Sequence, residues 1–485
     1  MDIIAVIYVM AAVLLSVSAA SYGLLLILYL LVRHRTPPRP RIDDDRLLSV
    51  TIQLPIYNEA DVVTRLIDAC VQLDYPTGKY HIQILDDSTD HTRQVICNRV
   101  AYWRARGVTH LHHICRPNRD GYKAGALAYG LTCTDSDCVV VFDADFVPRA
   151  DFLRRTMPYF SLNSHLGLIQ TRWNHLNSGY NLLTRAQALS IDGHFVIEQT
   201  ARNRWHLPMS MNGTGGVWRV SAIQDAGGWR ADTLTEDLDL SYRALMRGWE
   251  FLYLVDVTVP GELPPQVQAY KLQQARWATG STECLIRHIG PLMSSGRFSL
   301  LAKLMGVMHL AQYAVQPVIL LLFLLTPPLL YGDAFARLPD LRLLTLVGMV
   351  PLMMIVLAQI ELYDDWRRRL LFFPVQLMTA VAIVLNNSRA VLTVVIGPRR
   401  QREFRRTPKY RVNERDREWY SSVYRLKPDA NIIAELGLAV YAVFGLVLAL
   451  RTFPAFAPYM LTYAVSFAFF AGWNVRQGWR TTEAG

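Results

Sequence analysis

Apolar residues are gathered into separate long runs in this chain, and their distribution constrains the fold more than any other feature. The first run, residues 3–32, is almost uninterrupted. It exceeds the ~20 apolar residues that cross a bilayer as a helix. Further apolar stretches follow residue 300, whereas residues 48–290 are more polar. Such a chain cannot bury every apolar segment in one compact core. We therefore expect a water-soluble domain flanked by transmembrane helices.

The charges beside the first apolar run predict its orientation. One acidic residue precedes the run and four arginines follow it: Asp2, then Arg33, Arg35, Arg39 and Arg41. A signal peptide would carry positive charge before its apolar core and a cleavage site after it. The positive-inside rule instead places the N-terminus outside and the following domain in the cytoplasm. We predict that residues 1–34 are a transmembrane anchor in an integral protein of a cell inner membrane.

The basic residues indicate a membrane surface rather than a nucleic acid. The net charge is +10, and basic runs at 33–46, 367–369 and 399–406 adjoin apolar stretches. Such runs favour the anionic side of a bilayer. No nucleic-acid-binding motif is recognisable in the sequence. We expect the lipid bilayer, and no nucleic acid, as a partner.

Cysteine spacing argues against a framework of disulfides or zinc ligands. The six cysteines are Cys70, Cys97, Cys115, Cys133, Cys138 and Cys284, and none forms a Cys-x-x-Cys pair. A zinc site or disulfide framework is expected to show tighter, paired spacing. We interpret all six as reduced structural thiols in a cytosolic compartment.

The polar middle of the chain predicts an α/β domain over residues 46–290. Short apolar runs indicate buried parallel strands at Ser49–Leu54, Ile82–Leu85 and Val139–Phe142. Helical spacing lies between them, at Glu59–Leu73 and Arg93–Arg106. Strands and helices that alternate in this way predict a doubly wound sheet, whose ligands gather beyond the carboxyl ends of the strands.

Five apolar segments after residue 290 are candidate spans: Val307–Tyr331, Leu343–Gln359, Leu370–Asn387, Ile432–Leu450 and Pro454–Trp473. If the third crossed fully, the basic stretch 399–415 would lie outside, against the positive-inside rule. We therefore expect residues 370–396 to be partly interfacial or re-entrant. The chain then divides into membrane and interfacial helices (300–396), a cytosolic basic loop (397–430) and a helix pair (431–476).

Acidic pairs follow two of the predicted strands. Asp86 and Asp87 could bind a base or ribose, and a turn or helix N-cap explains them equally well. Asp143 and Asp145 directly follow the strand at 139–142. Two such carboxylates can hold a divalent cation on the phosphates of a nucleotide sugar, although a solvated turn is the alternative.

Two later motifs could complete a catalytic site. Glu236 and Asp237 stand where a helix begins, so either could serve as a general base, or both could simply favour the helix dipole. Arg276 and Trp277 come just before the apolar segments return. Arg276 could pair with a diphosphate and Trp277 could stack on a sugar ring. An interfacial membrane anchor is the alternative for this motif.

The order of these motifs resembles that of the family 2 membrane glycosyltransferases, which include cellulose synthase and ceramide glucosyltransferase. The resemblance extends to segments 53–59, 121–125, 142–146 and 212–219, and covers about Val50 to Arg287. In detail it is greatest to the mannan-synthase-like and xyloglucan-backbone-synthase-like branch. It implies a cytosolic GT-A type α/β domain flanked by transmembrane α-helices, and an inverting, metal-dependent hexosyltransferase.

The resemblance also implies roles for residues of the donor side. Asp86 or Asp87 would bind the nucleoside together with Pro55, Tyr57 and Glu59, with Lys123 nearby. Asp143 and Asp145 would hold Mg²⁺ or Mn²⁺ on the diphosphate of a nucleotide sugar donor of the UDP-glucose or GDP-mannose type. Asp237 would be the general base, with Glu236 the next candidate.

On the acceptor side, the resemblance assigns Asn212, Gly213, Thr214 and Gly215 to the acceptor end. Trp277 would stack on the acceptor sugar, and Gln273 and Arg276 would contact diphosphate or acceptor. A looser match resembles the gating loop of cellulose synthase, namely Phe404, Arg405, Arg406, Thr407 and Lys409. There, Arg405 and Arg406 replace smaller residues, and a basic lid over a diphosphate would result.

Three functions follow from these motifs. The first is a synthase that builds a β-linked polysaccharide and passes it through its own helices, where His309, Gln312, Tyr313 and Gln316 are candidate channel residues. The second is a lipid glycosyltransferase that adds a single sugar to ceramide or diacylglycerol. The acceptor is thus a glycan or a lipid, and the predicted site serves either. A nucleotide-binding transporter or scaffold is a minor alternative, since it would need neither the third carboxylate nor the tryptophan motif.

Overall fold

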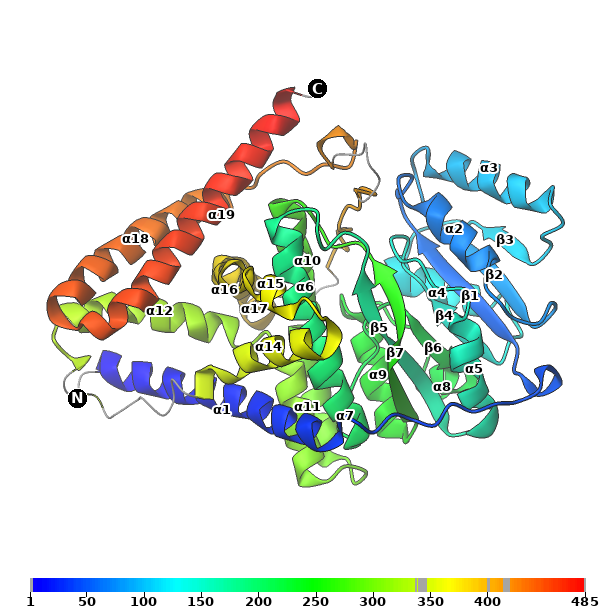
Figure 1. The fold of residues 1–485 in the computed structure, drawn as a ribbon, viewed down its shortest axis with the longest axis horizontal. Coiled ribbons are helices and arrows are strands. Elements are labelled where there is room, and N and C mark those ends of the chain that lie inside the picture. Colours follow the sequence, from blue (N-terminus) through cyan, green and yellow to red (C-terminus); the bar gives the residue numbers. More distant parts are fainter. Residues whose placement is uncertain (1–2, 336–337, 339–346, 399–401, 413–418, 484–485) are drawn as a thin grey trace.

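The computed structural model describes residues 3–335, 338, 347–398, 402–412 and 419–483. A seven-stranded sheet organises the domain between residues 50 and 261, to the right of helix α10 in Figure 1, and the apolar helices extend to the left. Its strand order is β3-β2-β1-β4-β6-β5-β7. The strands are β1 (Val50–Ile56), β2 (Tyr80–Asp86), β3 (Leu111–Ile114), β4 (Cys138–Val141), β5 (Leu166–His175), β6 (Gly216–Arg219) and β7 (Glu250–Gly261).

The three strands expected from the sequence are present and parallel. β1 lies between β2 and β4 and pairs in parallel with both. β6 is antiparallel to its neighbours β4 and β5, so the sheet is mixed. The sequence did not indicate β6, because only two apolar residues stand between Gly216 and Arg219, too short a run to suggest a buried strand. The predicted α/β fold class is confirmed, with this antiparallel strand as an addition.

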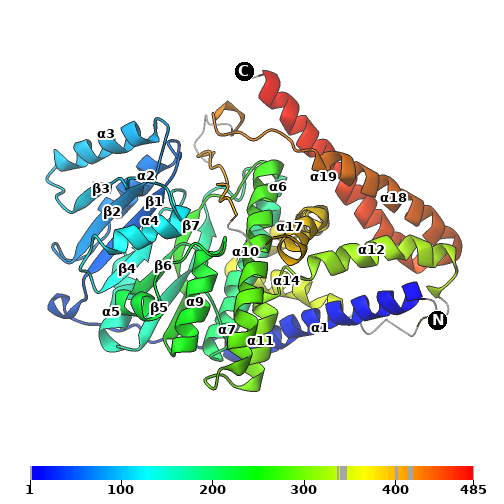
Figure 2. The same cartoon turned by 180° about the vertical axis from the view of Figure 1, so that it is seen from behind.

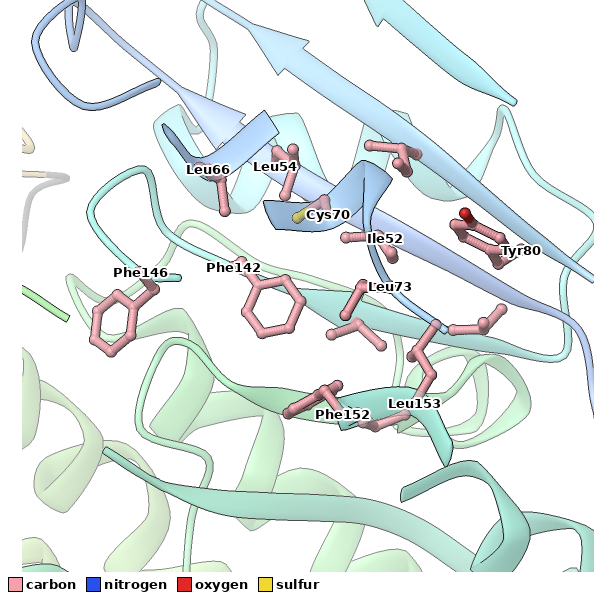
Figure 3. Close-up of a cluster of buried hydrophobic side chains, with 14 of the residues drawn as sticks. Ile52, Leu54, Leu66, Cys70, Leu73, Tyr80, Phe142, Phe146, Phe152 and Leu153 are labelled. Carbon is pink, nitrogen blue, oxygen red and sulfur yellow. The ribbon is translucent and has the colours of Figure 1, made fainter. Parts of the chain in front are cut away.

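Alternate residues of β4 enter two cores on opposite faces of the sheet. Cys138 and Val140 pack into one core with helices α2 (Val63–Val71), α3 (Thr92–Arg104) and α5 (Phe152–Leu162). Figure 3 shows this core, where Ile52 and Leu54 of β1 lie among side chains of α2 and α5. Val139 and Val141 pack into the other core with α4 (Tyr122–Leu131), α8 (Val220–Asp225) and α9 (Glu236–Arg247). Both faces are therefore covered, as the continuous apolar runs predict.

The predicted helix Glu59–Leu73 begins four residues late, at Val63. Asn58 has a φ of 54°, a left-handed conformation that asparagine tolerates better than most residues and that cannot belong to an α-helix. Residues 57–62 therefore turn away from β1 before α2 starts. This turn carries Glu59 to the end of the strand, where ligands are expected.

Within the described residues, four segments are long and apolar enough to cross a membrane by length and composition: Ile3–Val32, Trp366–Ile396, Asn431–Thr452 and Pro454–Gly478. The first is the whole of α1 (Ile3–Val32), and α18 (Asn431–Thr452) and α19 (Ala457–Glu483) match the two last expected spans. α18 and α19 lie side by side in Figures 1 and 2. α10 (Val267–Ser294) stands between the sheet and these helices, and a buried pair joins its Lys271 to Glu435 of α18 at 2.6 Å.

The expected single span Val307–Tyr331 is wrong, because the chain breaks there. α11 (Leu300–Leu310) ends in a turn, and α12 (Gln316–Tyr331) starts after it. Pro317 occupies the first turn of α12, and proline within a continuous helix would clash with the carbonyl of residue 313. The expected span Leu343–Gln359 begins outside the described residues. Its described part is helix α14 (Val350–Leu362).

The ambiguous segment after α14 is three short helices. α15 (Trp366–Leu370), α16 (Phe373–Ala382) and α17 (Val384–Ile396) follow one another with a break between each pair. In Figure 1, α16 is seen nearly end-on, whereas α1 and α12 lie in the plane of the picture. This segment therefore runs across its neighbours, and its interfacial course remains a prediction.

The remaining helices complete the junction between the sheet and the apolar helices. α6 (Leu182–Gly193) continues into a π-helix, η2 (His194–Gln199), and then into α7 (Thr200–Arg204). Three short 3₁₀ turns, η1 (Asp44–Arg46), η4 (Trp419–Ser421) and η5 (Pro454–Phe456), lie in the connections. α6 packs against α14 and α16, so the sheet domain is in direct contact with the apolar helices.

Candidate active site

A cavity of about 170 Å³ opens at the carboxyl ends of the central strands, next to α10. It is lined chiefly by the loops after β1, β2 and β4, the segment at 119–126, the end of β5, the loops at 212–213, 234–237 and 261–264, α10, and the segment at 404–409. These parts are separated by up to 350 residues. The cavity is therefore a product of the tertiary fold, in the place where α/β sheets bind ligands.

Asp143 and Asp145, the predicted metal ligands, both line this cavity, and each faces a lysine. Asp143 accepts a hydrogen bond of 2.6 Å from Lys123, whose ammonium also donates to the Gly213 carbonyl at 2.8 Å. Asp145 accepts a hydrogen bond of 2.6 Å from Lys409. Burial opposes charge on Lys123, but Asp143 and Glu236 raise the pKa of Lys123 above its ordinary value. Both carboxylates are thus neutralised by ammonium groups of the same chain.

The third carboxylate pair, Glu236 and Asp237, enters the cavity at the start of α9. Burial raises the pKa of Asp237 to about 7, and the neighbouring Glu236 carboxylate adds to the increase. α10 holds this corner closely, since a Cβ at Gly280 would lie 2.5 Å from the Thr235 side chain. A carboxyl with a pKa near 7 can take up a proton at physiological pH.

α10 presents Gln273, Arg276 and Trp277 to the cavity, as their spacing of three and four residues predicts. The Arg276 guanidinium lies 4.7 Å from the centre of the Phe404 ring. Among the residues that the structure describes, it forms no ion pair. Burial lowers the pKa of Arg276, while the carboxylates of Asp143 and Glu236 counteract this effect. A cation held in this way can receive an anionic ligand.

The segment at 402–412 brings basic and aromatic side chains to the carboxylates of the cavity. Arg406 pairs with Glu59 at 3.2 Å, and Lys409 also donates to the Glu262 carbonyl at 2.8 Å. Burial raises the pKa of Glu59 to about 7, although Arg406 counteracts the shift. Phe404 stacks on Tyr122, with ring centres 6.1 Å apart. Basic and aromatic side chains of this segment therefore form a roof over the carboxylates.

Two family profiles match this chain. "Glycosyltransferase like family 2" matches residues 49–280, and "Cellulose synthase" matches residues 222–477, which is more than half of the chain. The chain belongs to the cellulose synthase family. The resemblance inferred from the ordered motifs is thereby confirmed, and this cellulose synthase family member is an integral membrane protein.

Similar proteins share only part of their length with this family member. It is 44% identical over 250 residues to "Glucomannan 4-beta-mannosyltransferase 2" of Arabidopsis thaliana, covering 50% of this chain and 47% of that protein. It is 40% identical over 280 residues to a "Probable glucomannan 4-beta-mannosyltransferase 2" of Oryza sativa subsp. japonica, covering 56% and 48%. The chain thus spans about half the length of the curated relatives it matches.

A solved structure shares the fold. It is that of the mannosyltransferase PcManGT from Pyrobaculum calidifontis in complex with GDP-Man and Mn²⁺, with a TM-score of 0.53 and 18% identity. The likeness covers 80% of this family member and 99% of that protein. The expected GT-A type domain is confirmed at the level of the fold.

Some residues predicted to touch ligands lie outside the cavity lining of the described chain. Asp87 lines the cavity, held by Arg116 through hydrogen bonds of 2.7 and 2.6 Å, whereas Asp86 is buried behind it. Thr214 lies beneath the surface, where its hydroxyl accepts the N–H of Asp143 at 3.0 Å. Gly215 does not reach the cavity either. The structure thus separates supporting residues from those that can meet a ligand.

The five predicted gating residues differ in whether they line the cavity. Arg405 is exposed, pairs with Glu403 at 3.2 Å and does not line the cavity. The other four, Phe404, Arg406, Thr407 and Lys409, line it. Among the candidate channel residues, His309 is buried against the hydroxyl of Tyr242 at 2.9 Å, which is a packing contact rather than a channel surface.

The sequence motifs gave no role to several polar and aromatic residues of the lining: Arg119, Tyr122, Trp173, Asn174, His175 and Glu262. Arg119 lies 3.3 Å from the centre of the ring of Tyr57, a residue expected from the resemblance to contact the nucleoside. Residues 173–175 end β5, and His175 bonds to Asp192 at 3.0 Å. Had β5 been located from the sequence, its carboxyl end would have indicated these positions.

Proposed function

We propose that this protein transfers a hexose, with inversion, from a nucleotide sugar to a growing β-linked polysaccharide at the cytoplasmic face of an inner membrane. The observation that carries this proposal is the content of the single cavity described above. Two loop carboxylates separated by one residue, a third carboxylate with a raised pKa, an arginine that forms no ion pair with any described residue, and a tryptophan all meet there. Family membership supports the same reaction.

The relatives favour mannose as the transferred sugar. Two of them carry the name glucomannan 4-β-mannosyltransferase, and the structural neighbour holds GDP-Man. We therefore propose a GDP-mannose type donor, with UDP-glucose as the other candidate. Tyr57, Asp87 and Arg119 form the side of the cavity that would take the nucleoside. Lys123 and Arg276 supply positive charge where the diphosphate would lie.

Asp143 and Asp145 fit a hard divalent cation, Mg²⁺ or Mn²⁺, which would stabilise the charge of the departing nucleoside diphosphate. The observation that supports the fit is the pairing of both carboxylates with ammonium groups, since it shows that this position attracts positive charge. Lys409 belongs to the roof segment, so it can withdraw when a cation arrives. Lys123 is held by the Gly213 carbonyl and stays beside the diphosphate position.

Asp237 is the proposed general base. It would accept the proton of the acceptor hydroxyl as that oxygen attacks the anomeric carbon opposite the leaving diphosphate. A Cβ at Gly213 would lie 3.5 Å from the Asp237 carboxylate, and Gly213 has a φ of 80°. The positive φ favours glycine, and the absence of a side chain leaves space beside this base for a sugar hydroxyl.

The acceptor would arrive from the membrane side. Trp277 and Gln273 lie on α10, the helix that borders the apolar helices, and Trp173 also lines the cavity. An indole face stacked on a sugar ring buries apolar surface and orients the attacking hydroxyl. Such a platform is useful in every cycle of a polymer synthase, because each cycle after the first presents a sugar.

The decisive experiment uses the purified full chain with radiolabelled GDP-mannose, UDP-glucose and UDP-galactose. We expect a polymer from GDP-mannose. Trp277→Ala should abolish elongation yet leave slow hydrolysis of the donor, while Trp277→Phe should retain partial elongation. A single-sugar lipid as the only wild-type product would overturn the polymer proposal. Donor binding without turnover of any sugar would indicate a binding protein instead.

A further inference from the structure

A second group of potential metal ligands lies behind the side of the cavity proposed for the nucleoside, which is formed by Tyr57, Asp87 and Arg119 and is called the nucleoside wall below. It consists of Asp86 at the end of β2, His113 on β3 and Cys115 just after β3. One ligand atom of each lies within 4.8 Å of the others. The proposed sugar transfer uses none of these three side chains, since none of them lines the cavity. Their neighbour Asp87 does line it.

The separations suit a tetrahedral cation with sulfur and nitrogen ligands. His113 Nε2 lies 3.5 Å from Cys115 Sγ and 2.8 Å from Asp86 Oδ2. Zinc bonds of ~2.0–2.1 Å to nitrogen or oxygen and ~2.3 Å to sulfur place N and S about 3.5 Å apart, and O and N about 3.3 Å apart. The nitrogen and sulfur therefore already stand at a suitable separation, and the distance between the carboxylate oxygen and this nitrogen needs to increase by about half an ångström.

The surroundings orient these groups for binding. The other nitrogen of His113, Nδ1, lies 3.6 Å from Cys97 Sγ of α3, and such a partner holds a ligating imidazole in one orientation. Asp86 Oδ1 accepts the Ser88 N–H at 2.8 Å, which leaves Oδ2 for a cation. Cys115 is exposed, so an ion can enter from solvent and keep a water ligand.

One positive group competes at this site. Arg93 lies 3.7 Å from Asp86 Oδ2, but its side chain is 52% exposed and can turn into solvent. A thiolate, an imidazole and a carboxylate together prefer a borderline-soft cation to Mg²⁺ or Mn²⁺. The group thus differs in chemistry from the carboxylate pair Asp143 and Asp145.

We propose that Asp86, His113 and Cys115 form a second metal site, specific for Zn²⁺-like cations and separate from the catalytic carboxylates. The ion ties the end of β2 to the end of β3. Asp87 and Arg116, the adjacent residues in sequence, form the ion pair of the nucleoside wall. Zinc bound here therefore stabilises the wall against which the nucleoside rests.

Cobalt titration of the full chain in detergent, after removal of metals, tests the site. Co²⁺ bound to a thiolate gives a charge-transfer absorption that carboxylate sites do not give. We expect one such Co²⁺ per chain, displaced by Zn²⁺. Cys115→Ser should abolish the band, whereas Cys133→Ser, at another exposed cysteine, should leave it unchanged. An Asp143→Asn, Asp145→Asn double variant should also retain it, because that change affects only the carboxylate pair.

Thermal unfolding provides the second measurement and does not depend on catalysis. Zn²⁺ should raise the Tm of the wild type and of Cys133→Ser, and the increase should be absent in Cys115→Ser and His113→Gln. Absence of the thiolate band in the wild type would overturn the proposal. So would a band that persists in Cys115→Ser, or equal stabilisation of all four proteins by Zn²⁺.

Discussion

The floor and the roof of the cavity differ in charge and in origin. The floor consists of the six acidic residues of the lining between residues 55 and 237: Glu59, Asp87, Asp143, Asp145, Glu236 and Asp237. They lie in the loops after strands and at the start of α9. The roof is basic and comes from the segment after α17, with Arg406 and Lys409. The two halves are joined only after the chain has passed through its apolar helices.

This difference shows how the protein keeps a concentrated acidic site folded without substrate. Buried carboxylates are costly unless they are paired. Arg406 and Lys409 provide partners for Glu59 and Asp145, so the roof neutralises part of the floor. Under the proposed function, metal and donor replace these contacts. We therefore expect substitutions or metal removal in the floor to abolish sugar transfer, and substitutions in the roof to change the affinity for metal and donor.

Removal of divalent cations tests the floor and should have the largest effect. We expect transfer to fall to background in EDTA, because two carboxylates alone cannot neutralise a leaving diphosphate. Mg²⁺ or Mn²⁺ should restore the activity. Recovery with these hard cations assigns the effect to Asp143 and Asp145 rather than to a thiolate site. Full turnover in chelator would contradict the proposed metal dependence.

Asp237→Asn tests the proposed general base and should have the second-largest effect on transfer. The substitution keeps the shape of the side chain and removes proton acceptance, so kcat should fall by about 10²-fold or more, as for other general bases. Donor affinity, measured by equilibrium binding, should change little. Normal transfer in this variant would move the role to Glu236.

Lys409→Gln tests the roof and should have an effect of opposite sign on the metal. Without the ammonium at Asp145, the affinity for Mn²⁺ in the absence of nucleotide should rise about tenfold, which corresponds to about 1.4 kcal/mol. Donor KM should increase, because the roof loses a cation. Arg405→Gln is the matched control, since Arg405 lies outside the cavity. Unchanged Mn²⁺ affinity would show that Lys409 does not compete for the metal position.

The pH dependence should show the smallest effect. Because the pKa of Asp237 is raised to about 7, the base is protonated in acid, and kcat should fall as the pH drops through about that value. Glu236→Gln removes a charge that raises this pKa, so the acid limb should move to lower pH by about one unit or less. A limb that stays in place would exclude electrostatic coupling between the two residues.

Sequence patterns were sufficient for features that depend on neighbouring residues. Apolar runs of adequate length indicated α1, α18 and α19, because the hydrocarbon thickness sets their length directly. Continuous apolar runs indicated the central strands, and ordered motifs indicated the family. In each case the residues that determine the feature lie close together in the sequence, mostly within one helix, strand or motif.

Features that depend on two distant segments were decided only by the tertiary structure. Asp86 and Asp87 are adjacent, but successive side chains at a strand end point to opposite faces, so only the packed sheet decides which one reaches the cavity. The spacing rule for cysteine ligands did not group Cys115 with Asp86 and His113, which come from different segments. Likewise, Asp145 and Lys409 are 264 residues apart and meet only because the chain returns from its apolar helices. Local sequence therefore determined the elements and the chemistry they carry. Folding alone determined which charges face each other, because electrostatic pairing depends on distance in space.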